Sequence, residues 1–222
     1  MAASDGGNPT PQGVHAQGNP LPGAPHCERV RQYLKEWRRI GGSGWVLDTL
    51  ANGIYLPWTR RPSRHRSKEY PVNPRDQDWL EGELDRGLRH GFYKELSAKD
   101  AVKAHCIVPA FVVWSAGTPR MVIDYRLPNE YLEQRKFKYE SLLDLAPQLR
   151  PGDAMLSWDM KDAFFHLEVR PRDRQYLCFT VLGRVLQPVV MPFGLRLAPF
   201  FWTTVCRPLV AELRRLGFRV VA

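Results

Sequence analysis

The chain has 222 residues, 44% of them hydrophobic and 25% charged, which is enough for one or two globular lobes with a buried core. Its formal net charge of +9 favours nucleic acid as a partner, with a membrane surface as the weaker alternative. No run of 18 apolar residues occurs and the N-terminus lacks the regions of a signal peptide, so we expect an intracellular protein, nuclear or cytoplasmic, without a membrane partner.

The N-terminal stretch has the composition of a disordered tail. Residues 1–25 contain ten Gly or Pro, no aromatic residue and no Lys or Arg. They cannot bury enough apolar surface to offset the entropy lost on ordering. A basic extension is predicted over residues 26–70, beginning with an amphipathic helix that ends at Gly41–Gly42. Two apolar runs follow, Trp45–Leu50 and Ile54–Leu56, and the second indicates a short strand.

A run of cations closes this extension. It contains Arg60, Arg61, Arg64, Arg66 and Lys68, and the next acidic residue is Glu69. Two interpretations remain open: a solvated loop, or a segment that contacts nucleic-acid phosphates or directs nuclear import.

Residues 71–222 alternate helical and strand patterns, which predicts an α+β fold. The first pattern is a helix with Asp76 or Asp78 as its cap, Gly91 as its end and an apolar stripe formed by Trp79, Leu80, Leu84 and Leu88. Two strand-like runs about the turn Ser115–Thr118 then predict a hairpin over residues 108–125.

Arg120 lies beside that turn, on the second strand of the predicted hairpin. Its guanidinium could reach a phosphate with its planar fork of donors. The alternative is that charges on this strand only pair with one another, as Asp124 and Arg126 can, since they lie two residues apart.

A short helix over Ser141–Leu145 and a turn at Pro151–Asp153 precede the apolar run Ala154–Trp158. We interpret this run as a buried strand that ends at Asp159, with Asp162 in the turn beyond it. The two aspartates could cap a helix, or Asp159 could hold a divalent metal ion for phosphoryl transfer. Spacing alone leaves both readings open.

The C-terminal third predicts a hairpin, a helix and a strand. Residues 175–190 form the hairpin about Leu182–Gly183, and a helix with Pro208 inside it runs over residues 197–216. Residues 218–222 indicate a further buried strand. The four cysteines are scattered along the chain, which is typical of free thiols.

Three motifs in order resemble the reverse transcriptases of retrotransposons. They are Arg120-Met-Val-Ile-Asp-Tyr-Arg-Leu-Pro-Asn129, Ser157-Trp-Asp-Met-Lys-Asp-Ala-Phe-Phe-His166 and Met191-Pro-Phe-Gly-Leu195. The Pro-Phe-Gly-Leu version is most similar to gypsy-type and DIRS-type elements. The resemblance implies the fingers and a partial palm of a right-hand polymerase fold over residues 71–222, and RNA-directed DNA synthesis on a template-primer.

The resemblance also implies roles for single residues, with Mg²⁺ or Mn²⁺ as cofactor and a dNTP as substrate. Asp159 and the backbone carbonyl of Met160 would bind metal. The backbone N–H groups of Asp162 and Ala163 would meet the triphosphate, and Phe164 would be the steric gate against a 2′-hydroxyl. The remaining implied contacts are Arg120 with the triphosphate and Phe193 and Gly194 with nucleotide and template.

Two departures from the family pattern affect the expected activity. Val113-Trp-Ser-Ala116 replaces the lysines that relatives carry in the fingers turn, so that phosphate contact would depend on Arg120 alone. The family's Tyr-x-Asp-Asp turn, which supplies the other metal carboxylates, is absent and would be expected just after Ala222. We therefore expect a truncated domain that is inactive alone. The alternatives are a non-enzymatic basic nucleic-acid-binding protein and a product that does not stay folded.

Overall fold

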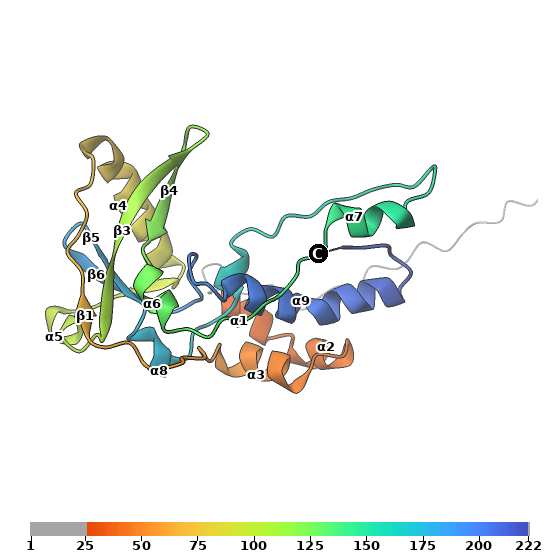
Figure 1. The fold of residues 1–222 in the computed structure, drawn as a ribbon, viewed down its shortest axis with the longest axis horizontal. Helices are drawn as coiled ribbons and strands as arrows, with labels where there is room; N and C mark the ends of the chain where they lie inside the picture. Colours follow the sequence, from red (N-terminus) through yellow and green to blue (C-terminus); the bar gives the residue numbers. More distant parts are fainter. Residues whose placement is uncertain (1–25, 222) are drawn as a thin grey trace, which may run out of the picture.

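The computed structural model describes residues 26–221, except for the side chain of Leu142. The predicted tail over residues 1–25 lies outside the described residues. A sheet with one long helix beside it forms one end of the molecule, and a layer of helices extends from its base (Figure 1). No helix in the described range combines the length and apolar content needed to cross a membrane.

The sheet is built around one long strand that pairs differently along its two halves. Strand β3 (Cys106–Ser115) pairs in parallel with β1 (His65–Arg66) and β5 (Cys178–Val181) through its first residues. From Ala110 onward it pairs antiparallel with β4 (Thr118–Ile123), and this hairpin projects beyond the rest of the sheet beside α4. Strands β6 (Arg184–Pro188) and β2 (Tyr93–Glu95) complete the order β1-β3-β5-β6-β2.

Both predicted hairpins are confirmed, and so are their turns. Ala116 and Gly117 join β3 to β4 with φ of 49° and 77°. Leu182 and Gly183 join β5 to β6 with φ of 53° and 72°. Positive φ at both central residues marks the two-residue turn whose twist matches that of the flanking strands.

The helices lie near their predicted positions, with differences at their ends. In chain order they are α1 (His26–Arg31), α2 (Leu34–Arg39), α3 (Gly44–Asn52), α4 (Pro74–Arg89), α5 (Ala98–Ala101), α6 (Arg126–Glu130), α7 (Leu142–Leu145), α8 (Pro171–Arg174) and α9 (Ala198–Arg215), with 3₁₀ turns η1 (Ala146–Gln148) and η2 (Ala163–His166). The predicted N-terminal helix is thus two short helices, broken at residues 32 and 33.

Helix α4 is capped by a residue other than the two predicted. The side chain of Asn73 accepts from the N–H of Arg75 at 3.1 Å. Asp76 is instead buried, with its carboxylate turned toward Trp114. The predicted apolar stripe is confirmed, since Leu80 and Leu84 are fully buried in the core.

One hydrophobic core joins the helices and the sheet. It includes Val46 and Leu50 of α3, Phe179 of β5, and Phe201 and Val205 of α9. The predicted strand at residues 54–56 is only a single bridge between Ile54 and Val169. Ile54 and Leu56 are buried by packing rather than by a ladder, and Tyr55 is exposed.

Two predicted palm strands are wrong. Residues 154–159 and 218–221 have no regular secondary structure. Met155, Leu156 and Trp158 are 75%, 78% and 73% exposed, whereas a buried strand was expected. An apolar run can form a buried strand only where other strands pair with it and cover it, and none of the described strands pairs with either segment.

Candidate active site

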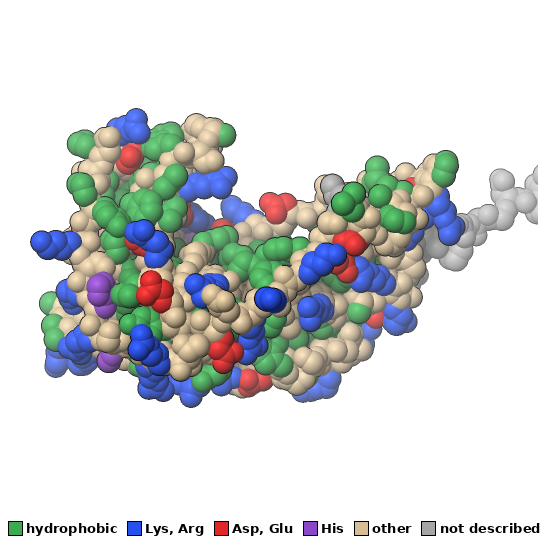
Figure 2. All heavy atoms as spheres, in the orientation of Figure 1, with side chains coloured by type: hydrophobic (Ala, Val, Ile, Leu, Met, Phe, Trp, Pro, Cys, Tyr) green, Lys and Arg blue, Asp and Glu red, His purple; other side chains and the backbone are tan. Residues whose placement is uncertain are grey.

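A cavity of about 570 Å³ lies between α4 and β4, where the β3–β4 hairpin leaves the sheet. Its walls are Trp79, Glu83, Arg86, Tyr93, Pro119, Arg120, Met121, Val122, Ile123, Asp162, Phe165, Phe193 and Gly194. Four predicted site residues, Arg120, Asp162, Phe193 and Gly194, therefore meet in one place although 74 positions separate the first from the last. On the surface, the molecule is hollowed between the hairpin and the end that carries α7 (Figure 2).

Arg120 lines the cavity on the wall formed by β4. It pairs across the hairpin with Val113, two residues from the turn. The side chain is exposed, and none of the ion pairs among the described residues includes it. It is therefore the cavity cation that remains available for an anionic ligand.

The Asp162 carboxylate already has protein partners. Its φ of 54° places it in the left-handed region, at the start of η2. Arg86 Nη1 donates to its Oδ2 at 3.3 Å, and His26 Nε2 lies 3.8 Å from the same oxygen. Arg86 also donates to both carboxylate oxygens of Glu83, at 3.0 and 2.7 Å. These carboxylates, Glu83 foremost, raise the pKa of Arg86 above its ordinary value, so that the group stays charged.

Aromatic rings close the inner side of the cavity. The ring of Phe193 lies 4.8 Å from that of Phe164 and 5.3 Å from that of Phe165, measured between centroids. Phe164 and Ala163 are half-buried in η2, directly behind Asp162. The predicted steric-gate residue thus contacts a wall of the cavity.

Gly194 occupies a position that admits no side chain easily. Its φ is +92°, and a Cβ there would lie 3.3 Å from the backbone oxygen of Ile123. Asn129 fixes the loop, because its Nδ2 donates to the oxygen of Gly194 at 2.9 Å and its Oδ1 accepts from the N–H of Arg196 at 2.8 Å. The ends of the first and third sequence motifs are therefore joined by one side chain.

The two predicted metal ligands are not among the residues that line this cavity. Asp159 and Met160 are exposed and belong to the irregular segment before η2. Within the described residues, no group of three or more His, Cys, Asp and Glu side chains is placed to hold a metal ion. The metal-binding role of Asp159 stays a prediction.

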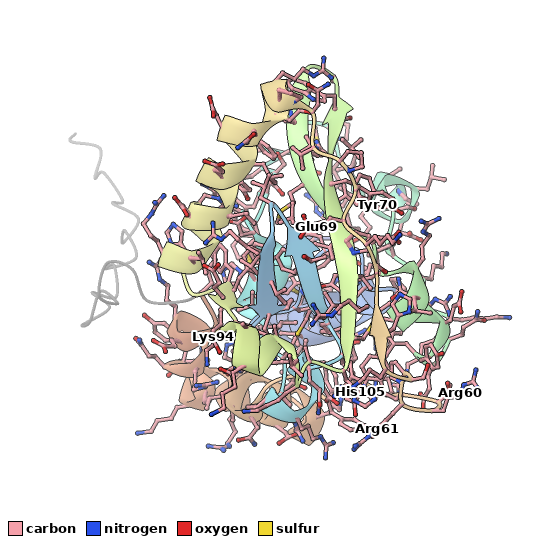
Figure 3. All side chains as sticks on the ribbon, turned by 90° about the vertical axis from the view of Figure 1, so that its left-hand side faces the viewer. Arg60, Arg61, Glu69, Tyr70, Lys94 and His105 are labelled. Carbon is pink, nitrogen blue, oxygen red and sulfur yellow. The ribbon has the colours of Figure 1, made fainter. Side chains whose placement is uncertain are left out.

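The predicted basic segment includes one short strand. His65 and Arg66 form the edge strand β1, and the guanidinium of Arg60 lies 5.1 Å from the ring centroid of Tyr131. Arg60 and Arg61 lie at the rim of the molecule (Figure 3). Arg61, Arg64 and Lys68 are exposed and take part in none of the ion pairs among the described residues.

Sequence reasoning missed the half of the cavity that comes from α4 and β2. Arg86, Glu83 and Trp79 belong to a helix whose pattern predicted only a core-facing stripe. Tyr93 follows that helix, and burial raises the pKa of its hydroxyl. Nothing in the local pattern distinguishes Glu83 and Arg86 from the ordinary solvent-facing side of an amphipathic helix, and Trp79 belongs to the predicted apolar stripe.

The hairpin tip is attached to the N-terminal end of α4 by Trp114. Its Nε1 donates to Asp76 Oδ1 at 3.0 Å, and the guanidinium of Arg75 lies 5.3 Å from its ring centroid. Because the cavity lies between α4 and β4, this contact fixes the distance between its two walls. The tryptophan that replaces the expected lysines therefore has a structural role.

We expect Trp114→Ala to release the hairpin without unfolding the core. The lost hydrogen bond and cation–π contact should raise amide hydrogen exchange in residues 112–122 about tenfold. Val113→Ala, on the neighbouring exposed position, is the matched control. Unchanged exchange in the hairpin, or an equal increase in β5, would show that Trp114 does not hold the hairpin.

Three histidines meet behind Asp162. The ring of His26 stacks on His166 at 4.8 Å between centroids, and His90 lies 6.3 Å away. Burial, aided by His166, Arg29 and His90, lowers the pKa of His26 below its ordinary 6.5, and Asp162 opposes this shift. His26 is therefore held neutral in the folded chain around neutral pH.

The free energy of unfolding should consequently fall as the pH drops below 6.5. In that range the unfolded chain binds a proton at residue 26 before the folded chain does, and the loss ends at the lower folded-state pKa. Thermal unfolding at about pH 7.5 and pH 5.5 measures this difference. His26→Gln should reduce it, and an equal pH dependence in that variant would contradict the assignment.

The cysteines are free thiols, as predicted. Cys27, Cys106 and Cys178 are buried and Cys206 is half-buried, and none forms a disulfide among the described residues. Burial raises the pKa of Cys106 to about 11.

Comparison with known proteins assigns the fold. No protein-family model matches the chain. The Tf2-7 and Tf2-3 transposon polyproteins of Schizosaccharomyces pombe are each 27% identical to it over 147 residues, which cover 66% of this chain and 11% of each polyprotein. The chain thus spans about a tenth of the length of these relatives.

Two solved structures share the architecture. A foamy viral protease-reverse transcriptase in complex with dsDNA superposes with a TM-score of 0.57 at 16% identity, over 87% of this chain and 43% of that one. The native prototype foamy virus protease-reverse transcriptase gives 0.53 at 21% identity, over 77% and 21%. The fold is that of reverse transcriptases, which confirms the predicted α+β class. The chain therefore has the fold of reverse transcriptases, and its sequence is similar to that of retrotransposon polyproteins.

Proposed function

We propose that this chain provides the fingers and part of the palm of a gypsy-type or DIRS-type reverse transcriptase, and that a dNTP binds in the cavity between α4 and β4. The family reaction is template-directed DNA synthesis by two-metal phosphoryl transfer on an RNA or DNA template-primer. We further propose that the 222-residue chain does not catalyse this reaction alone. The division into an extension over residues 26–70 and a domain over residues 71–222 is part of the same proposal.

One observation carries the nucleotide site: the cavity gathers residues from all three motifs. Arg120 supplies an unpaired cation for the triphosphate, whereas Arg86 holds the carboxylate of Asp162. The backbone N–H groups of Asp162 and Ala163 would donate to phosphate oxygens. Phe164 would face the sugar, and Phe193 and Gly194 would lie against the base and the template.

The residues present do not fit a two-metal centre. Such a centre needs at least two carboxylates around ions about 3.5–4 Å apart. Within the described part of the chain, no group of three or more His, Cys, Asp and Glu side chains is placed to hold a metal ion, and the carboxylate of Asp162 is engaged by Arg86.

The nucleotide site is tested by measuring dTTP binding to the chain by calorimetry. Arg120→Ala should weaken binding about tenfold or more, because a charge-assisted hydrogen bond to phosphate contributes about 1.5–3 kcal/mol. Arg215→Ala removes an exposed cation at the far end of α9 and is the control. Equal affinities of the wild type and Arg120→Ala would contradict the site.

A non-enzymatic nucleic-acid-binding protein is the second candidate. The exposed cations Arg61, Arg64 and Lys68 favour it, because they are not neutralised by neighbouring carboxylates. Binding to a nucleic-acid strand without any affinity for dTTP would select this candidate over the first.

A further inference from the structure

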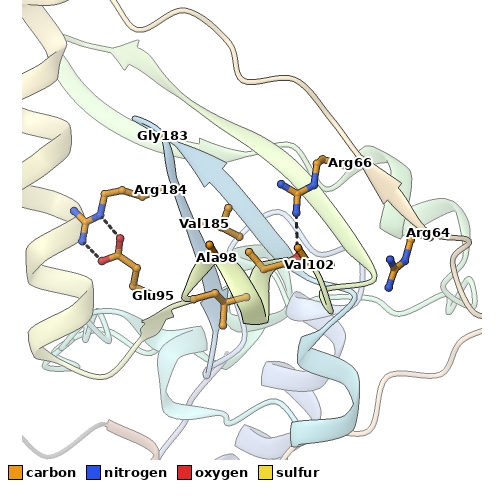
Figure 4. Close-up of a pocket in the computed structure, with 10 residues that line it drawn as sticks. Arg64, Arg66, Glu95, Ala98, Val102, Gly183, Arg184 and Val185 are labelled. Carbon is orange, nitrogen blue, oxygen red and sulfur yellow. Dashed lines mark hydrogen bonds and ion pairs between the residues drawn. The ribbon is translucent and has the colours of Figure 1, made fainter.

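A second pocket, of about 550 Å³, lies on the outer side of the sheet (Figure 4). Its lining residues are Arg64, Arg66, Glu95, Leu96, Ala98, Ala101, Val102, Gly183, Arg184 and Val185. None of them lines the nucleotide cavity. Leu96 and Val185 belong to a small hydrophobic cluster, with Ile107 and Cys178, that is separate from the main core.

The pocket carries an excess of positive charge. Three arginines line it against one carboxylate, that of Glu95. Arg184 engages this carboxylate through both oxygens, at 3.0 and 2.7 Å, and lies 3.7 Å from Asp85. The hydrogen bonds from Arg184 lower the pKa of Glu95, which keeps the pair ionic. The charges of Arg64 and Arg66 are left without an acidic partner in the lining.

The backbone of β1 directs both of these arginines into the pocket. The backbone N–H of Ser67 donates to the oxygen of Ile107 in β3, and that of His65 to the oxygen of His105 just before β3, at 2.9 Å each. Their side chains hydrogen-bond to each other at 2.8 Å and so share one face of the strand. Alternation places Arg64 and Arg66 on the other face, about 6.6 Å apart along the strand. Arg66 Nη2 donates to the backbone oxygen of Ala101 at 3.0 Å, which fixes its position beside the pocket.

The floor of the pocket is apolar. Short aliphatic side chains from α5 and β6 form it, and Val102 is 65% exposed there. A flat apolar group could cover Val102 and Val185 while an attached anion meets Arg64 and Arg66. A nucleotide combines these two features, since it joins a base to a phosphate.

We propose that this pocket binds a nucleotide unit of a single-stranded nucleic acid, with its phosphate on Arg64 and Arg66 and its base over Val102 and Val185. The inference rests on the nucleic-acid binding in the proposed function and adds a second contact to it. A free nucleotide has the same chemistry. A strand is favoured because Arg60, Arg61 and Lys68 continue the row of cations beyond the pocket.

Fluorescence anisotropy with a labelled 20-nucleotide oligo(dT) strand tests this contact. The variant Arg64→Ala/Arg66→Ala should bind the strand more weakly at low salt. Losing the contact with this phosphate should also make the loss of affinity between about 50 and 200 mM salt roughly two- to threefold smaller than in the wild type. Arg150→Ala/Arg215→Ala removes the same charge from exposed positions elsewhere and should leave the salt dependence unchanged.

Further variants and a dTTP-binding measurement distinguish binding of a strand from binding of a free nucleotide. Arg64→Lys/Arg66→Lys keeps the charge and should retain most of the affinity, and Arg64→Gln/Arg66→Gln tests the contact if the alanine variant does not fold. Binding of dTTP should be equal in all these proteins. Equal strand binding and salt dependence in the wild type and the alanine and glutamine variants would overturn the inference, as would a loss of dTTP binding alone. If the wild type binds no strand, the nucleic-acid part of the proposed function fails as well.

Discussion

The purified 222-residue chain should not extend a primer on an RNA or a DNA template, with either Mg²⁺ or Mn²⁺. Asp159 alone leaves the metal ions short of ligands, and stabilisation of charge on the transferring phosphate is the largest catalytic contribution. The sequence contains no Tyr-x-Asp-Asp to supply further carboxylates. A gel assay that detects single-nucleotide extension measures this directly.

Extension by the wild-type chain that disappears in Asp159→Asn would overturn the inactive assignment. Extension that survives in that variant would indicate a contaminating polymerase. The two results are distinguishable because both proteins are purified in the same way.

The role of Asp159 itself needs a chain in which synthesis can occur. We would join residues 26–222 to the Tyr-x-Asp-Asp hairpin and thumb of a related retroelement. In an active chimera, Asp159→Asn should lower the rate of synthesis by at least about 10²–10³-fold, as expected for the loss of a charge that stabilises the reacting phosphate. Asp144→Asn, in the exposed helix α7, should leave the rate unchanged. Equal rates for both variants would remove Asp159 from the site.

Asp173→Ala should cause the largest loss of stability among single polar substitutions. This carboxylate is buried, with 2% of the residue exposed. It accepts from Trp58 Nε1 at 3.0 Å and from the N–H of Leu56 at 3.3 Å, and so fixes the segment after α3 against α8. Its removal leaves a buried donor unpaired, which should lower the free energy of unfolding by about 3 kcal/mol.

Chemical denaturation of Asp173→Ala and Asp78→Ala measures this loss. Asp78 is an exposed carboxylate of α4, and its removal should change the free energy of unfolding by less than about 0.5 kcal/mol. A similarly small change for Asp173→Ala would show that water replaces the carboxylate without cost.

Local patterns predicted the parts of the fold that depend on neighbours in sequence. The β3–β4 hairpin followed from two apolar runs about Ser115–Thr118, and the β5–β6 hairpin from Leu182–Gly183. Helix α4 followed from its apolar stripe. In each case the residues that define the element also form its contacts. The hydrophobic periodicity and the turn residues were therefore enough to predict the element.

The errors concern residues whose surroundings come from elsewhere in the chain. Met155 and Leu156 have strand composition, but the described residues offer them no paired neighbour, and they lie exposed. Asp76 has the position of a cap, yet it is used by Trp114 from the hairpin 38 residues away. Composition describes what a segment can do and does not specify its tertiary partner.

Only part of the candidate site was predicted, because some of its contacts join residues that are far apart in the sequence. The motifs identified Arg120, Asp162, Phe193 and Gly194, and the structure brings these four together. Arg86 was missed because its importance arises from a hydrogen bond to Asp162 across 76 residues. A hydrogen bond between residues so far apart leaves no periodic pattern in the sequence.

Photoaffinity labelling of the chain with a photoreactive dNTP, followed by peptide mapping, tests the central claim most directly. We expect adducts in residues 118–123 and at Phe193–Gly194, with labelling suppressed by unlabelled dTTP and reduced in Arg120→Ala but not in Arg215→Ala. Adducts concentrated outside the cavity between α4 and β4, or labelling that dTTP does not suppress, would contradict the claim that this cavity is a nucleotide site.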